Sequence, residues 1–257
     1  MEKNQIKGIV SLTAAALLFS LYGIFSRLLG LDFGIFYQAF SRSLIIFLIL
    51  VVFLLLKKTW KKVEKKDYKW FLAMSSFGLA SVIGFFVTAN KLAIATNLFL
   101  FYTGSTIGGY ILGSVFFNEK LTRIKIVSLT VCLMGLLMIF SSPLDKQNLT
   151  YMILAFSIGF GAAAWSVFSK KVSSKYSLVQ VSAIDEFILI VLTLPLIIIF
   201  KEPILLPAFS LLWLNVFLFA FSVLAASLLV FNGFKYLEAQ TGTLFMLLEP
   251  VFGVVFG

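Results

Sequence analysis

The chain has 257 residues, of which 61% are hydrophobic and 12% are charged, and its mean hydropathy is +1.05. Soluble domains contain roughly 45–50% apolar and about 25% charged residues, so the composition excludes a soluble globular protein and indicates an integral membrane protein. The net charge of +10 does not indicate nucleic-acid binding, because most basic residues lie in short loops between apolar runs.

Residues that carry redox, metal or nucleotide chemistry are scarce. The chain contains no histidine and one cysteine, Cys132, which lies in an apolar run. These counts exclude imidazole chemistry and an internal disulfide, and they leave no framework for a metal site. The phosphate-binding pattern GxxxxGK[ST] does not occur, which argues against an ATP-driven pump. We therefore expect no cofactor, no metal and no catalytic residue.

Apolar runs of about 20 residues, the length with which a helix crosses a bilayer, recur along the whole chain. They predict nine membrane helices, at residues 7–29, 34–56, 70–89, 94–117, 124–140, 150–169, 178–200, 210–232 and 241–257. With the N-terminus inside, most of the 21 basic residues lie on the cytoplasmic side; the exceptions are Arg27, Arg42, Lys91, Lys146 and Lys201. The positive-inside rule therefore predicts a cytoplasmic N-terminus.

One stretch of the sequence occurs twice. KLAIATNLFLFYTGSTIGGYILG (residues 91–113) aligns with KYLEAQTGTLFMLLEPVFGVVFG (residues 235–257) at a constant offset of 144. Both copies carry glycines four residues apart, a spacing that places small residues on one helix face and allows close helix packing in lipid. These glycine pairs are Gly104/Gly108, Gly109/Gly113 and Gly253/Gly257.

The repeat extends to polar residues earlier in each half. At an offset of 143, Tyr22 corresponds to Trp165 and Arg42 corresponds to Asp185. Because five predicted helices separate the copies, corresponding helices cross the membrane in opposite directions, as in many secondary transporters. The sequence thus predicts an all-α polytopic membrane protein with two inverted five-helix repeats, at residues 1–142 and 143–257. Ten helices are expected and about nine are present, so we expect the second repeat to be incomplete at its C-terminus.

Several motifs resemble the EamA-like transporters of the drug/metabolite transporter superfamily. They are Arg42 in FSRSLIIF, FNEKLT (residues 117–122), the helix around Gly135, Trp165 in AAAWSVFSKK and LEPV (residues 248–251). Thr106 stands where the first repeat of that family often has proline, which raises the question whether the fourth span bends as the ninth should. The resemblance implies a secondary transporter in a bacterial plasma membrane, surrounded by lipid, that moves amino acids, related metabolites or drugs, often by export.

Ionisable groups inside the membrane cost roughly 2.5–3.5 kcal/mol each on insertion scales, so each one requires an explanation. Arg27 lies close to a helix end and can extend to the headgroups. Arg42 lies about 12 Å inside its helix at 1.5 Å per residue, and either faces a cavity or pairs within the protein. Asp185 and Glu186 are adjacent, so their side chains point about 100° apart and do not share one cavity.

The predicted sites follow from these positions. Glu249 precedes Pro250, which interrupts the backbone hydrogen bonds of its helix and exposes acceptors near mid-membrane, although the carboxyl could instead be a packing contact. Aromatic and amide side chains at similar depth suit a small organic solute. The predicted substrate-binding residues are Tyr22, Gln38, Arg42, Asn90, Tyr102, Trp165, Asn232 and Glu249. The proton-coupling candidates are Asp185, Glu186 and Glu249.

The sequence is compatible with three function classes. The leading hypothesis is a secondary transporter that exports a small metabolite, such as an amino acid or related compound, by alternating access. Proton coupling is a separate hypothesis. The alternative is an integral membrane enzyme that acts on lipid or a lipid-linked sugar, and the third class is a scaffold or receptor subunit without transport activity.

Overall fold

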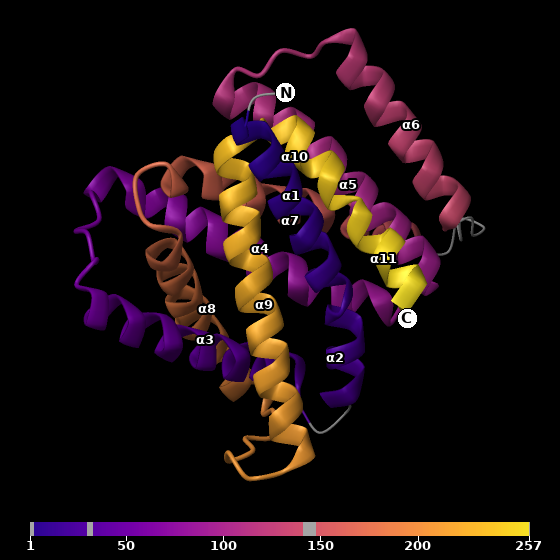
Figure 1. Cartoon of the computed structure of the whole chain (residues 1–257). Coiled ribbons are helices and arrows are strands. Elements are labelled where there is room, and N and C mark those ends of the chain that lie inside the picture. Colours follow the sequence, from indigo (N-terminus) through magenta and orange to yellow (C-terminus); the bar gives the residue numbers. More distant parts are fainter. Residues whose placement is uncertain (1–2, 30–32, 141–147, 257) are drawn as a thin grey trace.

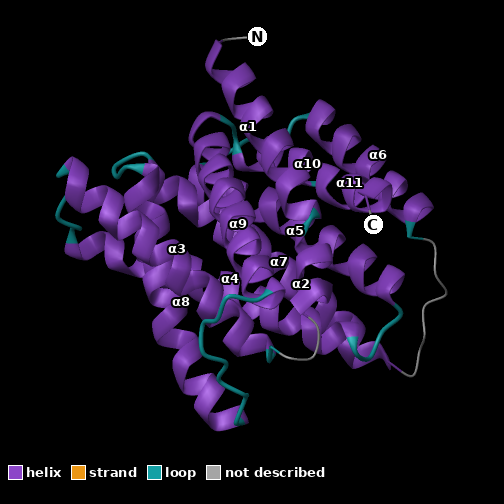
Figure 2. Cartoon of the chain, turned by 60° about the horizontal axis from the view of Figure 1, so that its bottom comes forward, coloured by secondary structure: helices purple, strands orange, loops and turns teal. Residues whose placement is uncertain are grey.

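The computed structural model describes residues 3–29, 33–140 and 148–256. Within these ranges the only regular secondary structure is helical, and loops connect the helices (Figures 1 and 2). The first half contains α1 (Lys3–Ser20), α2 (Tyr22–Leu29), α3 (Ile35–Lys57), the short 3₁₀ helix η1 (Lys65–Asp67), α4 (Tyr68–Ala89), α5 (Ile94–Phe117) and α6 (Arg123–Ile139). The second half contains α7 (Leu149–Ser173), α8 (Leu178–Phe200), α9 (Leu211–Tyr236), α10 (Ala239–Met246) and α11 (Leu248–Phe256).

All nine predicted spans form helices, and the two at the chain ends are each divided in two. The fifth, predicted at 124–140, forms α6, whose 17 residues leave it outside the segments long enough to cross a membrane. Eight described segments are long and apolar enough to cross a membrane. The first predicted span is divided into α1 and α2 at Leu21, and the ninth is divided into α10 and α11 at Leu247. The second break lies one turn before Pro250, as expected for a proline that removes a backbone donor. In contrast, α5 continues without interruption past Thr106, whose hydroxyl donates to the Tyr102 carbonyl 2.8 Å away.

The helices form two bundles and one pair, and each bundle mixes the two repeats. The first bundle contains α4, α5 and α7, and the second contains α1, α9, α10 and α11. Helices α3 and α8 pack along each other and form what we call the crossing pair (Figure 1). The prediction of two inverted repeats holds for helix order, but the repeats are interleaved in space, because α7 packs with first-repeat helices and α1 packs with second-repeat helices.

Contacts at both ends of the crossing pair show that its helices are antiparallel. Next to the start of α3, the Glu202 carboxylate beyond the end of α8 accepts hydrogen bonds from the backbone N–H groups of Phe36 (3.2 Å) and Tyr37 (2.7 Å). At the other end, the Lys61 backbone N–H donates to the Gln180 side chain at the start of α8 (3.1 Å). The loop after α8 thus satisfies free N–H groups at the start of α3, as a helix N-terminus requires. The loop after α3 instead binds the Gln180 side chain in the first turn of α8.

Two of the predicted glycine pairs lie at helix contacts. A Cβ atom on Gly104 would collide with the Phe156 carbonyl of α7, and Gly108 lies against Phe160 and Ala163 of the same helix. On another face of α5, Gly109 lies against Thr243 of α10 and Gly113 against Gln240 and Ala239. A Cβ on Gly253 would meet no atom within 4 Å, so this third pair has no such contact at its described member, and Gly257 lies outside the described residues. The glycines of α5 therefore allow this helix to contact both bundles closely.

We call the basic end the part of the molecule formed by the start of α1 and by the ends of α3, α5, α7 and α9 with the segments that follow them, each of which carries lysine or arginine. Contacts join these segments: Lys61 with the Lys175 carbonyl, and Lys170 with Glu119 and the Leu237 carbonyl. At this end Lys175 forms an ion pair with Asp67 (2.7 Å), and the Tyr176 hydroxyl donates to the same carboxylate (2.9 Å). Burial raises the pKa of the Tyr176 phenol. These contacts hold η1, which precedes α4, against the connection between α7 and α8.

Candidate functional site

Arg42 lies in the interior, with its side chain held by two aromatic rings. It belongs to α3 and is 5% exposed. Its Nη1 donates a hydrogen bond to the Tyr22 hydroxyl of α2 (2.9 Å), and its guanidinium carbon lies 5.1 Å from the Tyr22 ring centre and 4.8 Å from that of Phe219 in α9. Rings at these distances stabilise a cation that has left water. We refer to Tyr22, Arg42 and Phe219 as the arginine cluster.

Asp185 lies in a second interior cluster that holds the opposite charge. It belongs to α8 and is 3% exposed. The Ser75 hydroxyl of α4 donates to Asp185 Oδ1 (2.6 Å), and the Trp165 indole N–H of α7 donates to Oδ2 (3.0 Å). Hydrogen bonds to both oxygens are what a buried carboxylate requires. We refer to Ser75, Trp165 and Asp185 as the aspartate cluster.

The two clusters occupy equivalent positions of the repeat. Tyr22 and Trp165, and likewise Arg42 and Asp185, are related by the offset of 143, and Ser75 and Phe219 are 144 residues apart. In each cluster, one residue comes from the crossing pair, one from the first span of the same repeat, and one from the other repeat. The inverted repeat therefore places a cation and an anion at equivalent positions on the two helices of the crossing pair, each with partners suited to its charge.

Glu186 faces α3 and not the aspartate cluster, which agrees with the predicted 100° separation of neighbouring side chains. It is 4% exposed, and the Ser43 hydroxyl and the Arg42 guanidinium are the α3 groups that lie near its carboxyl, without a hydrogen bond of ordinary geometry from either to Glu186 Oε2. Three buried oxygens here have no hydrogen-bond partner, namely Ser43 Oγ, Ser182 Oγ and Glu186 Oε2, and Arg42 Nε also has none. The contact between α3 and α8 thus contains polar groups without hydrogen-bond partners, including one basic and one acidic side chain.

Glu249 lies directly after the break between α10 and α11, in the first turn of α11. Its carboxyl interacts with the hydroxyl of Tyr102, a buried residue of α5. This pair brings together two of the predicted residues across the two bundles. It shares no residue with the arginine or the aspartate cluster.

The remaining predicted residues make separate contacts. The Gln38 side chain accepts a hydrogen bond from the Ser26 hydroxyl (3.2 Å), and the Asn232 amide donates to the Ser11 hydroxyl (2.8 Å). Asn90 is exposed at the end of α4, where its amide donates to the Phe86 carbonyl (2.9 Å). The structure therefore places Asn90 outside both clusters, because it ends a helix by bonding its own backbone.

Sequence reasoning did not single out the polar contacts that join the two bundles at the basic end. Glu119, 9% exposed, accepts hydrogen bonds from the backbone N–H groups of Ala239 (2.7 Å) and Gln240 (3.0 Å) at the start of α10. It also forms an ion pair with Lys170 of α7 (3.1 Å), and the Gln240 amide donates to the Ser114 hydroxyl of α5 (2.9 Å). We call these contacts the basic-end latch. Glu119 belongs to a motif noted in the sequence, but its role as a helix cap required the structure.

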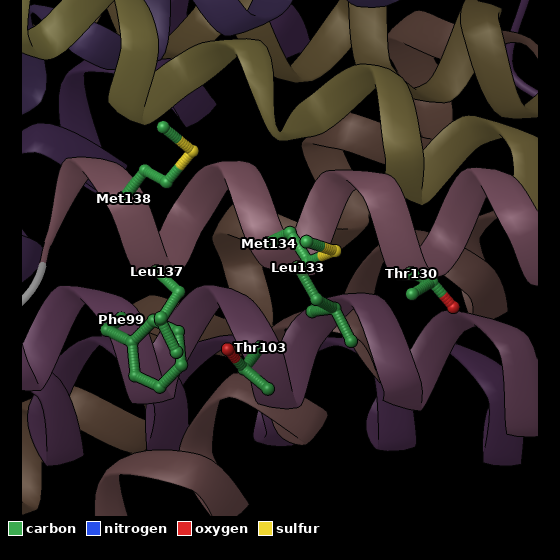
Figure 3. A pocket seen from close by; sticks show the side chains of 7 residues that line it. All are labelled: Phe99, Thr103, Thr130, Leu133, Met134, Leu137 and Met138. Atoms are coloured by element: carbon green, nitrogen blue, oxygen red, sulfur yellow. The ribbon is translucent and has the colours of Figure 1, made fainter.

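A pocket of about 340 Å³ lies between α5 and α6 (Figure 3). It is lined by Phe99, Thr103, Thr130, Leu133, Met134, Leu137 and Met138. Five of these seven side chains are apolar, and none belongs to either cluster, so this pocket is a poor candidate for a polar solute. Across the described residues, no group of three or more acidic or cysteine side chains is arranged to hold a metal ion.

Comparisons with known proteins agree with this architecture. One solved structure, described only as the crystal structure of a protein, superimposes with a TM-score of 0.77 at 15% sequence identity, covering 96% of this chain and 86% of the other. At that identity the similarity concerns the fold alone. No curated protein matches the sequence. The sequence model of the EamA-like transporter family matches residues 6–141 and 149–257, which together span nearly the whole chain. The chain therefore belongs to the EamA-like transporter family.

Proposed function

We propose that this protein is a secondary transporter that exports a small metabolite, such as an amino acid or a related compound, by alternating access. The observation that supports this proposal is the matched pair of interior clusters, with Arg42 on one helix of the crossing pair and Asp185 on the other. A zwitterionic solute carries both a carboxylate and an ammonium group. A site with one buried cation and one buried anion is complementary to such a solute.

Alternating access fits the way the bundles are joined. The first and second bundles meet at the basic end through the latch of Glu119, Lys170 and Gln240. In transporters built from inverted repeats, one unit rocks against the other around a site near mid-membrane. Separation of the two bundles at the basic end, with closure at the opposite end, would expose the clusters to the two sides in turn.

We further propose that the basic end faces the cytoplasm of a bacterial cell. Lysine and arginine are enriched in the loops at this end, and cytoplasmic loops of membrane proteins carry such an excess. A membrane-impermeant maleimide applied to intact cells tests this orientation in a Cys132→Ser background. It should label a cysteine introduced at Lys91 and spare one introduced at Lys235.

The proposed function is tested by counterflow into proteoliposomes that contain the purified protein. The vesicles are loaded with one unlabelled L-amino acid, and a trace concentration of the same amino acid, carrying a radioactive label, is added outside. Uptake of the label is followed, and the assay is repeated for each proteinogenic amino acid. At least one should accumulate above protein-free vesicles. Arg42→Gln and Asp185→Asn should each lower that rate about tenfold or more, because a charged group that binds substrate contributes about 1.5–3 kcal/mol.

Lys91→Gln is the matched control, because Lys91 is exposed at the end of α4, away from the clusters, and this variant should keep the wild-type rate. Absence of counterflow for every amino acid would contradict the proposed solute class. Full activity in both cluster variants would contradict the proposed site. No observation in the described part of the chain favours the alternative of an enzyme acting on lipid.

A further inference from the structure

The Glu186 carboxyl is buried between the helices of the crossing pair without the hydrogen bonds that a charge requires. It is 4% exposed, and its Oε2 has no hydrogen-bond partner. The nearby hydroxyl oxygens of Ser43 and Ser182 are also buried and without partners. An ionised carboxylate left unpaired in such a place is strongly unfavourable, whereas a neutral carboxylic acid is tolerated. The surroundings of Glu186 in this conformation therefore suit its protonated form.

The charged groups around Glu186 are few. Arg42 faces it from α3, and Asp185 precedes it on α8 but points toward α4 and α7. Other titratable groups on the helices that pack against α8 all lie within four residues of a helix end: Tyr37, Lys57, Tyr68, Lys69, Tyr151, Lys170, Lys171, Lys235 and Tyr236. Arg42 is thus the interior cation available to an ionised Glu186.

Arg42 and Glu186 are close enough to interact but are not paired. Both residues belong to the described part of the chain, and no ion pair joins them there, while Arg42 Nε and Glu186 Oε2 both lack partners. Arg42 instead donates through Nη1 to Tyr22. The two residues stand on α3 and α8, which pack along each other. In the proposed transport cycle, a shift of one of these helices along the other changes the distance between the two unsatisfied groups.

The other two acidic candidates are placed differently. Both oxygens of Asp185 accept hydrogen bonds, from Ser75 and Trp165, so this carboxylate can remain charged while buried. Glu249 is only half-buried, and the Tyr102 hydroxyl lies near its carboxyl. Of the three acidic side chains, Glu186 is therefore the one whose surroundings stabilise an ionised carboxylate least.

We propose that Glu186 is the proton-carrying group of the transport cycle and that Arg42 is its partner in the deprotonated state. In the conformation described here Glu186 holds a proton. When the crossing pair becomes accessible to water, the proton leaves the carboxyl for water, and the carboxylate forms an ion pair with the free Nε side of Arg42. The charge of the crossing pair then falls by one, which links each proton to a change in the contact between α3 and α8. This assignment rests on the proposed transport function, since it names the coupling residue of that cycle.

Infrared spectroscopy of the purified protein in lipid nanodiscs tests this assignment without any solute. At neutral pH the wild type should show a protonated-carboxyl C=O band that Glu186→Gln removes and that Asp185→Asn and Glu249→Gln leave in place. A band that persists in Glu186→Gln, or that disappears in Glu249→Gln, would overturn the assignment. The three substitutions are matched, because each exchanges one carboxyl for an amide of nearly equal size.

Arg42→Gln tests the partner. Removal of the cation should move the pH at which the band disappears upward by about 1–3 units, the effect of a nearby opposite charge. An unchanged titration would show that Arg42 does not pair with Glu186. The spectra are independent of flux: absence of transport for every solute would refute the proposed function, while the band would still decide whether Glu186 holds a proton.

Discussion

At the residue scale, the chain keeps charges in the membrane interior by giving each one a specific environment. Arg42 rests against two rings and a hydroxyl, and Asp185 accepts hydrogen bonds from Ser75 and Trp165. The sequence predicted both charges and the equivalence of Tyr22 and Trp165, because the fixed offset of the repeat relates them. It could not predict Ser75, since a serine in an apolar helix has no distinctive pattern and its counterpart, Phe219, is a different kind of residue.

Replacement of Trp165 tests the aspartate cluster. Trp165→Phe removes the indole N–H and leaves Asp185 Oδ2 without its donor. A buried polar atom left unsatisfied costs about 1–3 kcal/mol, so the free energy of unfolding should fall by that amount. Denaturant unfolding in mixed micelles measures it. Trp60→Phe is the control, because Trp60 is 53% exposed and its loss should change the stability by less than about 0.5 kcal/mol. Equal effects of the two substitutions would contradict the structural role of the indole.

At the element scale, one of the two helix breaks could be predicted from the sequence and the other could not. Pro250 marks the break between α10 and α11, and the question raised by Thr106 is answered by an unbroken α5. The break at Leu21 was not predicted, because this region is apolar throughout and hydropathy does not report backbone geometry. There the Ser20 hydroxyl donates to the Leu17 carbonyl (2.7 Å), and the Leu21 N–H bonds Leu18, three residues earlier. Serine and glycine near one turn are a common cause of such kinks, and Gly23 follows closely.

The contact between α5 and α7 makes a sharp prediction for glycine. In Gly104→Ala the new methyl would collide with the Phe156 backbone, which cannot move aside as a flexible side chain can. The two helices must separate, and the free energy of unfolding should fall by about 1–3 kcal/mol. The matched control is Gly135→Ala in α6, where a Cβ meets no atom within 4 Å. There the helix should be unchanged or gain up to about 1 kcal/mol. The contact is refuted if Gly104→Ala is as stable as Gly135→Ala.

Glu119 joins the two bundles at the basic end, so its replacement tests whether this contact controls opening. Glu119→Gln removes the ion pair with Lys170 and weakens the cap of α10, so the basic end should open more often. In a Cys132→Ser background, a cysteine in place of the buried Thr243 reports this opening through its reaction with a water-soluble maleimide. The labelling rate should rise about tenfold, which corresponds to loss of a charged hydrogen bond.

The control for this experiment is Glu64→Gln. The Glu64 carboxylate also pairs with a lysine, Lys66 (2.7 Å), but both side chains are more than half exposed, and such surface pairs contribute little. This variant should leave the labelling rate of the cysteine at position 243 unchanged. Equal rates in the Glu119 variant and the wild type would mean that the latch does not control access.

At the scale of the whole molecule, the repeat is evident from the sequence and the interleaving of its copies is not. Offsets of 143 and 144 identify equivalent helices and their opposite directions, but they carry no information about which bundle each helix joins. The structure places α7 with α4 and α5, and α1 with α9, α10 and α11. The moving units of the proposed cycle are therefore these mixed bundles and not the two sequence halves, 1–142 and 143–257.

The proposed transport cycle requires the two bundles to separate at the basic end. A disulfide between α5 and α10 tests it, using Gly113→Cys and Ala239→Cys in a Cys132→Ser background. A Cβ on Gly113 lies 3.2 Å from that of Ala239, a few tenths of an ångström below the distance of about 3.5–4.5 Å in a disulfide, so a small shift of α5 against α10 admits the bond. The Glu119 side chain, 2.7 Å from the same Cβ, must move aside, and the Gly113→Cys single variant controls for this displacement. Counterflow in proteoliposomes should stop on oxidation of the double variant and return on reduction, while each single variant keeps its rate under oxidation. Continued counterflow through the fully cross-linked protein would contradict the claim.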